Sequence, residues 1–196
     1  MAGSPSPELA GLTPEGLAAA LRELYRQTDE SLRQRFARSL PFQDGLLDRW
    51  ERARRLGFAE GASIYNSAAV FGDVRVGRQT WVGPNCILDG SAAPLSIGAF
   101  CSIAAGVHVY THDTVLWALS GGACERRSGE VSIGDCVYLG AQSVIGLGTR
   151  IGHHCVVAAN SFVNRDVDDR TVVGGTPARR IGRVVGEGAD VSLCFE

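Results

Sequence analysis

An aliphatic residue recurs at every sixth position along most of this chain, and this repeat constrains the fold more than any other feature. One phased run starts at residue 70, slips by three residues after position 88 and continues to 109, and a second run extends from 133 to 163. The next residue is usually Gly or Ala. Neither an amphipathic helix, with its period of 3.6, nor an alternating strand, with its period of 2, produces such a pattern. The aliphatic positions are Val70, Val76, Val82, Leu88, Ile97, Ile103, Val109, Ile133, Leu139, Ile145, Ile151, Val157 and Val163.

A period of six predicts a solenoid. Each hexad would form a short strand and a turn, with its aliphatic side chain in a narrow core, and neighbouring coils would pair through parallel strands. The residue four positions after each aliphatic one is small or β-branched, and Cys86, Cys101 and Cys155 occupy that place. We therefore expect these cysteines to be reduced packing residues without a catalytic role.

The repeat resembles that of the hexapeptide-repeat acyltransferases, in particular the sugar O- and N-acetyltransferases, over roughly residues 62–183. This resemblance implies a mainly β fold, the left-handed parallel β-helix, in which three hexads make one triangular coil. It also implies a homotrimer with its sites between subunits. We expect a helical region over 1–60, the β-helix over 61–183 and a C-terminal tail over 184–196.

The region before the repeat has helical patterning. Thr13 and Pro14 form an N-cap and a first helical residue, and leucines follow at helical spacing up to Tyr25. Further helices are expected over about 29–38 and 45–56. We predict that these helices cap the open end of the solenoid. The alternative is that they also contact the acceptor substrate.

Composition excludes some classes of function. The net charge of −2 gives no reason to expect nucleic acid or a membrane surface as partner. Every basic residue is Arg, and the absence of Lys excludes Schiff-base chemistry. No apolar run is long enough to span a membrane, and Met1–Ser6 lacks the pattern of a secretory signal. We expect a cytoplasmic protein.

The break in the repeat predicts the catalytic region. Val109 and Ile133 flank a stretch in which the hexads are lost, so that an extruded loop is expected at about 113–131. Histidine is suited to general base catalysis near neutral pH. The family resemblance places the catalytic residue where such a loop leaves the coil, which is His112. His108 is a weaker alternative, and His153 and His154 are expected to be exposed.

Residues of the acceptor site are implied by the same resemblance. Asn85 would donate to the oxyanion or hold the acceptor, and Asp89 would bind the acceptor's hydroxyl or amino group. Asn85 has an alternative explanation as a turn residue in a left-handed conformation. Asp113 and Trp117, at the entry of the loop, are further candidates for substrate binding.

The segment after the loop resembles the family's acyl-CoA groove. Small residues allow the pantetheine arm to approach the backbone, with an aromatic wall at Tyr138. The arginines near the closing Gly-Gly-Thr-Pro-Ala stretch suit the phosphates of CoA. The expected contacts with acetyl-CoA are Tyr138, Gly140, Ala141, Ala158, Ala159, Arg165, Arg179 and Arg180.

The sequence thus predicts an acetyltransferase that uses acetyl-CoA to modify a hydroxyl or amino group of a sugar or nucleotide sugar, in polysaccharide biosynthesis. No metal is expected. The alternatives are a non-catalytic trimeric β-helix scaffold and a zinc enzyme on the same fold, the γ-type carbonic anhydrase, which needs three converging histidines.

Overall fold

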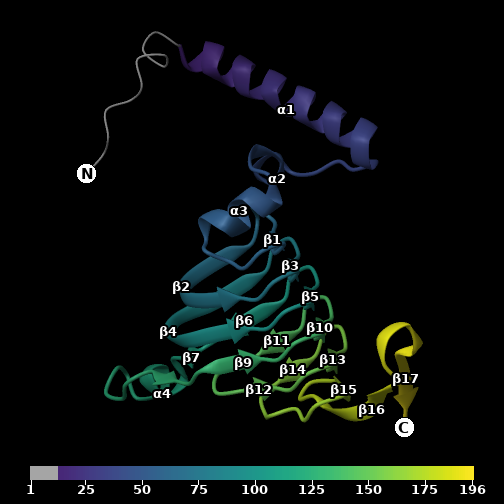
Figure 1. Cartoon of the computed structure of the whole chain (residues 1–196). Helices are drawn as coiled ribbons and strands as arrows, with labels where there is room; N and C mark the ends of the chain where they lie inside the picture. The colour runs from purple at the N-terminus through teal and green to yellow at the C-terminus, as the bar shows by residue number, and fades with distance from the viewer. Residues whose placement is uncertain (1–12) are drawn as a thin grey trace. The chain divides into compact units, whose positions relative to one another are not determined.

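The computed structural model describes residues 13–196, and the chain divides into two compact units, Met1–Leu46 and Leu47–Glu196 (Figure 1). Residues 1–6, in which no secretory signal is predicted, lie outside the described part. No described helix is long and apolar enough to cross a membrane. The domain boundaries expected after residues 60 and 183 stay predictions.

The first unit consists of α1 (Pro14–Phe36) and α2 (Phe42–Leu46). Thr13 caps α1 as predicted, because its Oγ1 accepts a hydrogen bond of 3.1 Å from the backbone N–H of Gly16. Two helices were expected in the stretch that α1 spans, but residues 26–28, between the two, contain no Gly or Pro to break the helix. The ring of Phe42 on α2 meets Tyr25 on α1 edge to face at 6.0 Å.

The second unit begins with α3 (Arg49–Arg55). The sequence predicts a longer helix over 45–56, but Asp48 starts a new one. Its carboxylate accepts hydrogen bonds from the backbone N–H groups of Trp50 and Glu51, at 3.0 and 3.1 Å.

Helix α3 covers the first coil of the β-helix. Ala53 and Phe58 are buried in the solenoid core. The guanidinium of Arg52 donates to the backbone carbonyls of Tyr65 and Ala68 at the open edge of that coil. The predicted capping role is confirmed for α3, and for α1 and α2 it stays a prediction.

The coils of the second unit stack in parallel register and form three faces (Figure 1). One sheet contributes the first face. The long strand β4 turns a corner, pairing with β6 before the corner and with β9 after it, so that a second sheet forms the other two faces. In strand order, the first sheet is β1 (Ser63–Ile64), β3 (Trp81–Val82), β5 (Ser102–Ile103), β10 (Tyr138–Leu139), β13 (Val156–Val157), β15 (Thr171–Gly174), β16 (Arg179–Val185) and β17 (Ser192–Phe195). The second contains β12 (Arg150–Ile151), β9 (Val131–Ile133), β4 (Ile87–Ile97), β6 (His108–Tyr110), β11 (Val144–Ile145) and β14 (Phe162–Val163), with β2 (Ala69–Val76) beside β4.

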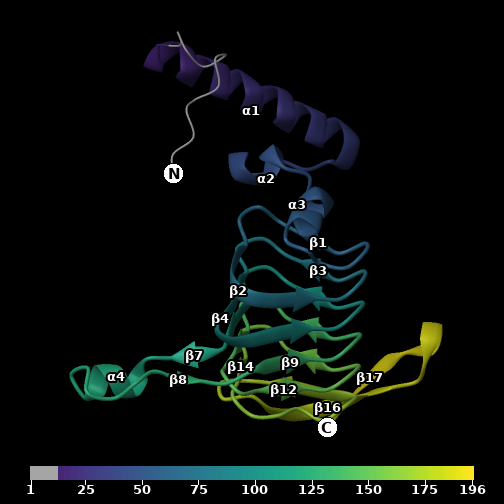
Figure 2. The same ribbon diagram turned by 60° about the vertical axis from the view of Figure 1, so that its left-hand side comes forward.

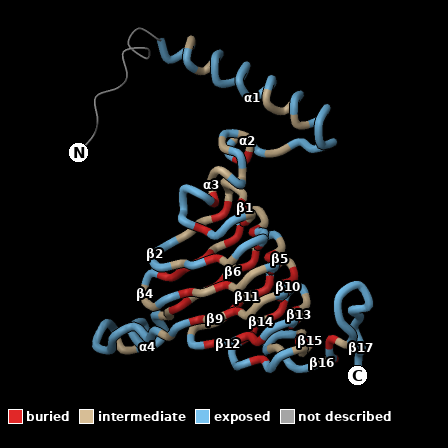
Figure 3. Tube along the Cα trace, viewed as in Figure 1, coloured by how far each residue is buried: buried red, intermediate tan, exposed pale blue. Residues whose placement is uncertain are grey.

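The core is a column of repeated aliphatic side chains inside the coils, and Figure 3 colours the buried residues red along the trace. Most of the positions predicted from the period of six are buried, and Leu88, Val109, Leu139, Ile145 and Val157 are fully enclosed. Each aliphatic side chain faces inward and its predecessor faces outward, because side chains alternate along a strand.

The hexad break forms a projection from the coils, as predicted (Figure 2). Strand β7 (His112–Asp113) leaves the coil, pairs in antiparallel fashion with β8 (Arg127–Ser128), and carries the short helix α4 (Val115–Leu119) between them. At the C-terminus, a turn of 3₁₀-helix (Gly188–Asp190) leads into β17, which pairs with β16.

Candidate active site

His112 lies where β7 leaves the coil. Its side chain is 23% exposed, and its Nδ1 atom is 3.6 Å from Oδ2 of Asp89. Nδ1 is buried and has no hydrogen-bond partner among residues 13–196. The accessible part of the imidazole therefore lies away from Nδ1.

Asp89 is held next to this imidazole by the sheet. It lies on β4 and is only 8% exposed. Oδ1 of Asp89 accepts a hydrogen bond of 2.9 Å from the backbone N–H of Ser91. Thr111, the residue before His112, donates to the carbonyl of Asp89 from both its backbone N–H and its buried Oγ1, at 3.2 and 2.9 Å. These bonds fix the start of the projection against Asp89.

The other histidines have different surroundings. Nδ1 of His108 is 3.3 Å from the hydroxyl of Tyr110, and the two rings meet edge to face. His153 and His154 are exposed, as predicted, and Nδ1 of His153 accepts a hydrogen bond from the backbone N–H of Asp135. Of the four, His112 alone has a buried Nδ1 without a hydrogen-bond partner in the described chain.

Asp113 faces Arg127 across the β7–β8 ladder. The guanidinium of Arg127 donates to both carboxylate oxygens of Asp113, with Nε at 3.2 Å from Oδ1. This hydrogen bonding lowers the pKa of Asp113. Asp113 thus closes the base of the projection, and Trp117, which is 53% exposed, lies on α4 beyond it. Arg127 is not among the residues predicted from sequence, although an Arg at the far end of the loop is the signal for such a closing ion pair.

Asn85 adopts a left-handed turn conformation, with φ of 56°. Its backbone N–H donates to Oγ of Ser67 at 3.2 Å. Ile87 pairs with His108, so that Asn85, on the turn before β4, is level with Gly106, six residues before His112. The structure therefore separates Asn85 from His112 within one chain. The equivalent turn position of other hexads also has positive φ, at Gln79, Phe100, Cys136, Gln142, His154, Asn160 and Arg170.

The small residues predicted to contact acetyl-CoA stack at one corner of the coils. Gly140 is buried, and a Cβ at this position would lie 2.4 Å from the backbone nitrogen of Ala159. Ala141 and Ala158 belong to the same corner, and their side chains are single methyl groups. Tyr138 faces outward from β10 and is 45% exposed.

The three arginines predicted for the phosphates line one cavity of about 210 Å³ near the last coil, together with Asp166 and Asp168. Arg180 forms an ion pair of 2.8 Å with Glu196, and Arg179 donates to the carbonyl of Ala178. The fold therefore brings Arg165, Arg179 and Arg180 together from two segments.

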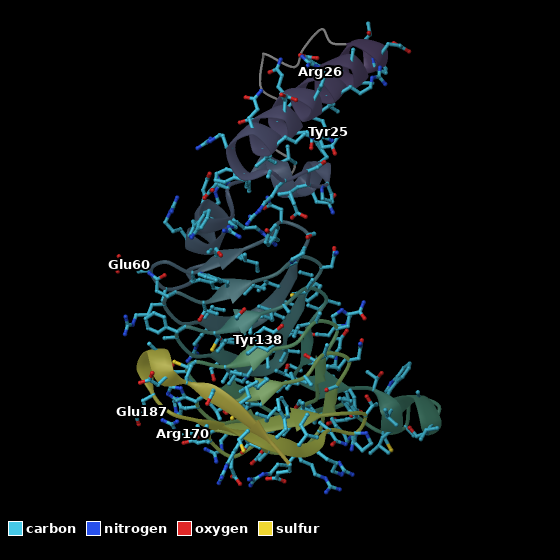
Figure 4. All side chains as sticks on the ribbon, turned by 90° about the vertical axis from the view of Figure 1, so that its right-hand side faces the viewer. Tyr25, Arg26, Glu60, Tyr138, Arg170 and Glu187 are labelled. Atoms are coloured by element: carbon cyan, nitrogen blue, oxygen red, sulfur yellow. The ribbon has the colours of Figure 1, made fainter. Side chains whose placement is uncertain are left out.

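A larger cavity of about 710 Å³ lies between the coils and the C-terminal segment, residues 184–196. Tyr138 and Val156 line its coil side, and Leu193 lines the other. Figure 4 shows Arg170 and Glu187 at the C-terminal segment, where they form an ion pair of 3.3 Å. The sequence does not predict this cavity, because residues 184–196 are expected to form a tail. The apolar alternation of Val191, Leu193 and Phe195 signals a strand there.

Comparisons with known proteins agree with this geometry. A family described as "Hexapeptide repeat of succinyl-transferase" matches residues 130–165. A crystal structure of a hexapeptide-repeat-containing acetyltransferase from Vibrio cholerae is similar to this chain with a TM-score of 0.63 and 31% identity, over 84% of this chain and 91% of that one. The chain belongs to the hexapeptide-repeat acetyltransferases. This membership confirms the predicted left-handed parallel β-helix.

Two further comparisons add detail. A structure of a hexapeptide-repeat-containing acetyltransferase from Vibrio cholerae complexed with acetyl coenzyme A has a TM-score of 0.56 and 32% identity, over 88% of this chain and 91% of that one. A chloramphenicol acetyltransferase from Escherichia coli is 31% identical over 121 residues, which is 52% of this chain and 57% of the relative. The chain thus spans about half the length of the curated relatives that it matches most strongly.

No metal site is found in this hexapeptide-repeat acetyltransferase within the described chain: residues 13–196 contain no group of three or more His, Cys, Asp or Glu side chains arranged to hold a metal ion.

Proposed function

We propose that this protein transfers the acetyl group of acetyl-CoA to a hydroxyl or amino group of a sugar or nucleotide sugar, with His112 as the general base. The observation that carries the proposal is the placement of the imidazole. Its Nδ1 is buried 3.6 Å from the Asp89 carboxylate, and its accessible part lies at the mouth of the projection.

This placement suits proton transfer at Nε2. A carboxylate beside Nδ1 favours the tautomer that carries its proton on Nδ1, which leaves Nε2 free to accept one. His112 takes the proton of the acceptor as the acceptor attacks the thioester carbonyl. It then returns that proton to the sulfur as the C–S bond breaks, so that the products are the acetylated acceptor and the CoA thiol.

The corner of small residues and the arginine-lined cavity support acetyl-CoA as donor. The pantetheine arm can approach the backbone at Ala141 and Ala159, because their side chains are single methyl groups. Arg165, Arg179 and Arg180 supply positive charge for its phosphates. The structure of the Vibrio cholerae relative with acetyl coenzyme A supports the same donor.

The proposal includes a homotrimer with sites between subunits. Val144 pairs with His108, so that Ala141 is level with Ala105, seven residues before His112. At about 3.3 Å per residue the CoA corner and His112 stand roughly 20 Å apart, at opposite edges of one face. In a symmetric trimer, the corner of one protomer can face His112 of its neighbour. Asn85 is far from His112 within one chain, and in the trimer it would reach the site from the neighbouring protomer.

A sugar acceptor is supported by the Tyr110–Thr114 stretch and residues 117–122, which resemble acetyltransferases of surface polysaccharide and nucleotide-sugar pathways. We place the reaction in the cytoplasm, in polysaccharide biosynthesis. The chloramphenicol acetyltransferase of Escherichia coli favours a second candidate, an antibiotic alcohol.

The test is a thiol-release assay with acetyl-CoA and a panel of sugars, amino sugars, nucleotide-linked amino sugars and chloramphenicol. We expect turnover with a member of the sugar classes. Turnover with chloramphenicol alone would replace the sugar by the antibiotic. If calorimetry showed no binding of acetyl-CoA, the acyltransferase proposal would be wrong and a scaffold would be the better description.

A further inference from the structure

Asp89 has an aromatic neighbour on each side in the sheet. In the register of β2, β4 and β6, Phe71 pairs with Asp89 and Asp89 pairs with Tyr110. Register partners in adjacent parallel strands project from the same face of the sheet, about 4.8 Å apart. The carboxylate beside His112 therefore lies between two aromatic side chains on the outer face of the coil.

These two rings differ in accessibility. Tyr110 is partly buried and its hydroxyl is engaged with His108. Phe71 is 50% exposed, although it lies within a paired strand. An exposed phenyl ring in the middle of a strand, one position across from a buried Asp, is available for a ligand.

The surroundings keep the Phe71 ring accessible. The residues that follow Phe71 and Asp89 are Gly72 and Gly90, which face each other at the bulge between β2 and β4. A Cβ on Gly72 would lie 2.3 Å from the carbonyl oxygen of Gly90, so that neither position can carry a side chain without a shift of the backbone. Bare backbone thus borders the ring on the side of the coil corner.

We propose that Phe71 is the surface on which the ring of the acceptor stacks, and that the acceptor is a cyclic molecule with an apolar face. An aromatic ring packs well against the C–H face of a pyranose or against another aryl ring, and a linear amino alcohol offers no such face. A ring that stacks on Phe71, next to the Asp89 carboxylate, orients the attacking group towards Nε2 of His112. This inference rests on the proposed function and names the specificity-determining residue of the same site.

The test compares cyclic and acyclic acceptors in the thiol-release assay. The cyclic acceptors are two pyranoses, glucosamine and methyl glucoside, and one aryl compound, chloramphenicol. The acyclic acceptors are ethanolamine, serine and sorbitol. Turnover is measured for each acceptor separately, so that pyranose and aryl acceptors are distinguished. We expect wild-type turnover with one cyclic class and none of the acyclic acceptors. Phe71→Ala should raise the KM of that acceptor about tenfold and leave the KM of acetyl-CoA within about twofold. Phe71→Trp should retain a low KM.

Phe100→Ala is the matched control. Phe100 is also a phenylalanine exposed by 50%, but it lies on a turn, where it stacks on Arg78. This variant should keep the wild-type KM of the acceptor.

Three results would overturn the inference. One is preference for an acyclic acceptor, and another is an unchanged acceptor KM in Phe71→Ala. The third is loss of the trimer on size exclusion with Phe71→Ala, which would make Phe71 an interface residue. Failure of the proposed function itself has a different signature: no acceptor, cyclic or acyclic, releases thiol with wild-type protein. That result would remove the inference as well.

Discussion

The carboxylate of Asp89 and the imidazole of His112 approach to 3.6 Å, although they come from β4 and from the start of the projection. Two hydrogen bonds from Thr111 to the carbonyl of Asp89 set this approach. The chain thus leaves the hexad repeat after Val109 at the point where His112 is placed against the buried carboxylate of Asp89.

Asp89→Asn should lower kcat by about tenfold or more while the KM of acetyl-CoA stays unchanged. An amide carries no charge to stabilise the imidazolium and does not enforce the tautomer that leaves Nε2 free. Steady-state kinetics with varied donor and varied acceptor provide the measurement. A raised acceptor KM at constant kcat would instead make Asp89 an acceptor-binding residue, the role expected from sequence.

The periodic part of the fold could be predicted from sequence, because every hexad repeats the same local physics. Leu88 and Leu139, for example, are both buried because each is the inward-facing aliphatic residue of its hexad. The pairing of Asp89 with His112 could not be predicted, because it depends on which coils stack after the break. The sequence also could not separate α2 from α3, since the capping carboxylate of Asp48 acts only through its local geometry. His112 could be proposed from sequence because it stands at the break itself.

Gly90→Ala should destabilise the protein by about 2 kcal/mol or more. A Cβ at Gly90 would lie 2.2 Å from the carbonyl oxygen of Asp73, so that the corner between β2 and β4 must shift. Gly146→Ala is the control, because its Cβ would meet nothing closer than 3.5 Å and Gly146 has no positive φ. Urea unfolding of both variants measures the difference. Equal stability of the two would show that the corner is not tightly packed.

Arg179→Ala should raise the KM of acetyl-CoA more than it changes kcat, because a phosphate contact binds ground state and transition state alike. The position lines the small cavity with Arg165 and Arg180. Wild-type protein should also bind CoA more tightly than 3′-dephospho-CoA in calorimetry. Equal affinity for the two ligands would argue against a contact between this cavity and the ribose phosphate.

The six thiols should fall into two classes. Burial raises the pKa of Cys101 to about 11 and also raises the pKa of Cys86 and Cys155. At pH 8 the buried thiols are protonated and inaccessible, and only the thiolate reacts. Ellman's reagent should therefore modify three cysteines in the native protein and all six after unfolding. The exposed three are Cys124, Cys136 and Cys194.

The same raised pKa values set a dependence of stability on pH. From the ordinary thiol value of 9.0 towards about 11, the unfolded chain releases protons that folded Cys101 keeps. The contribution of the buried thiols to the free energy of unfolding should have its full value below pH 9. It should fall as the pH rises from 9 towards about 11. Rapid native labelling of more than three thiols at pH 8 would contradict the burial that underlies both expectations.

The most direct test of the central claim is the thiol-release rate of His112→Ala, measured beside wild type and His154→Ala, an exposed histidine on a turn. We expect His112→Ala to lose about a hundredfold or more in kcat while calorimetry gives a nearly unchanged Kd for acetyl-CoA, and His154→Ala to keep the wild-type kcat. Near-wild-type turnover of His112→Ala would contradict the assignment of His112 as the general base.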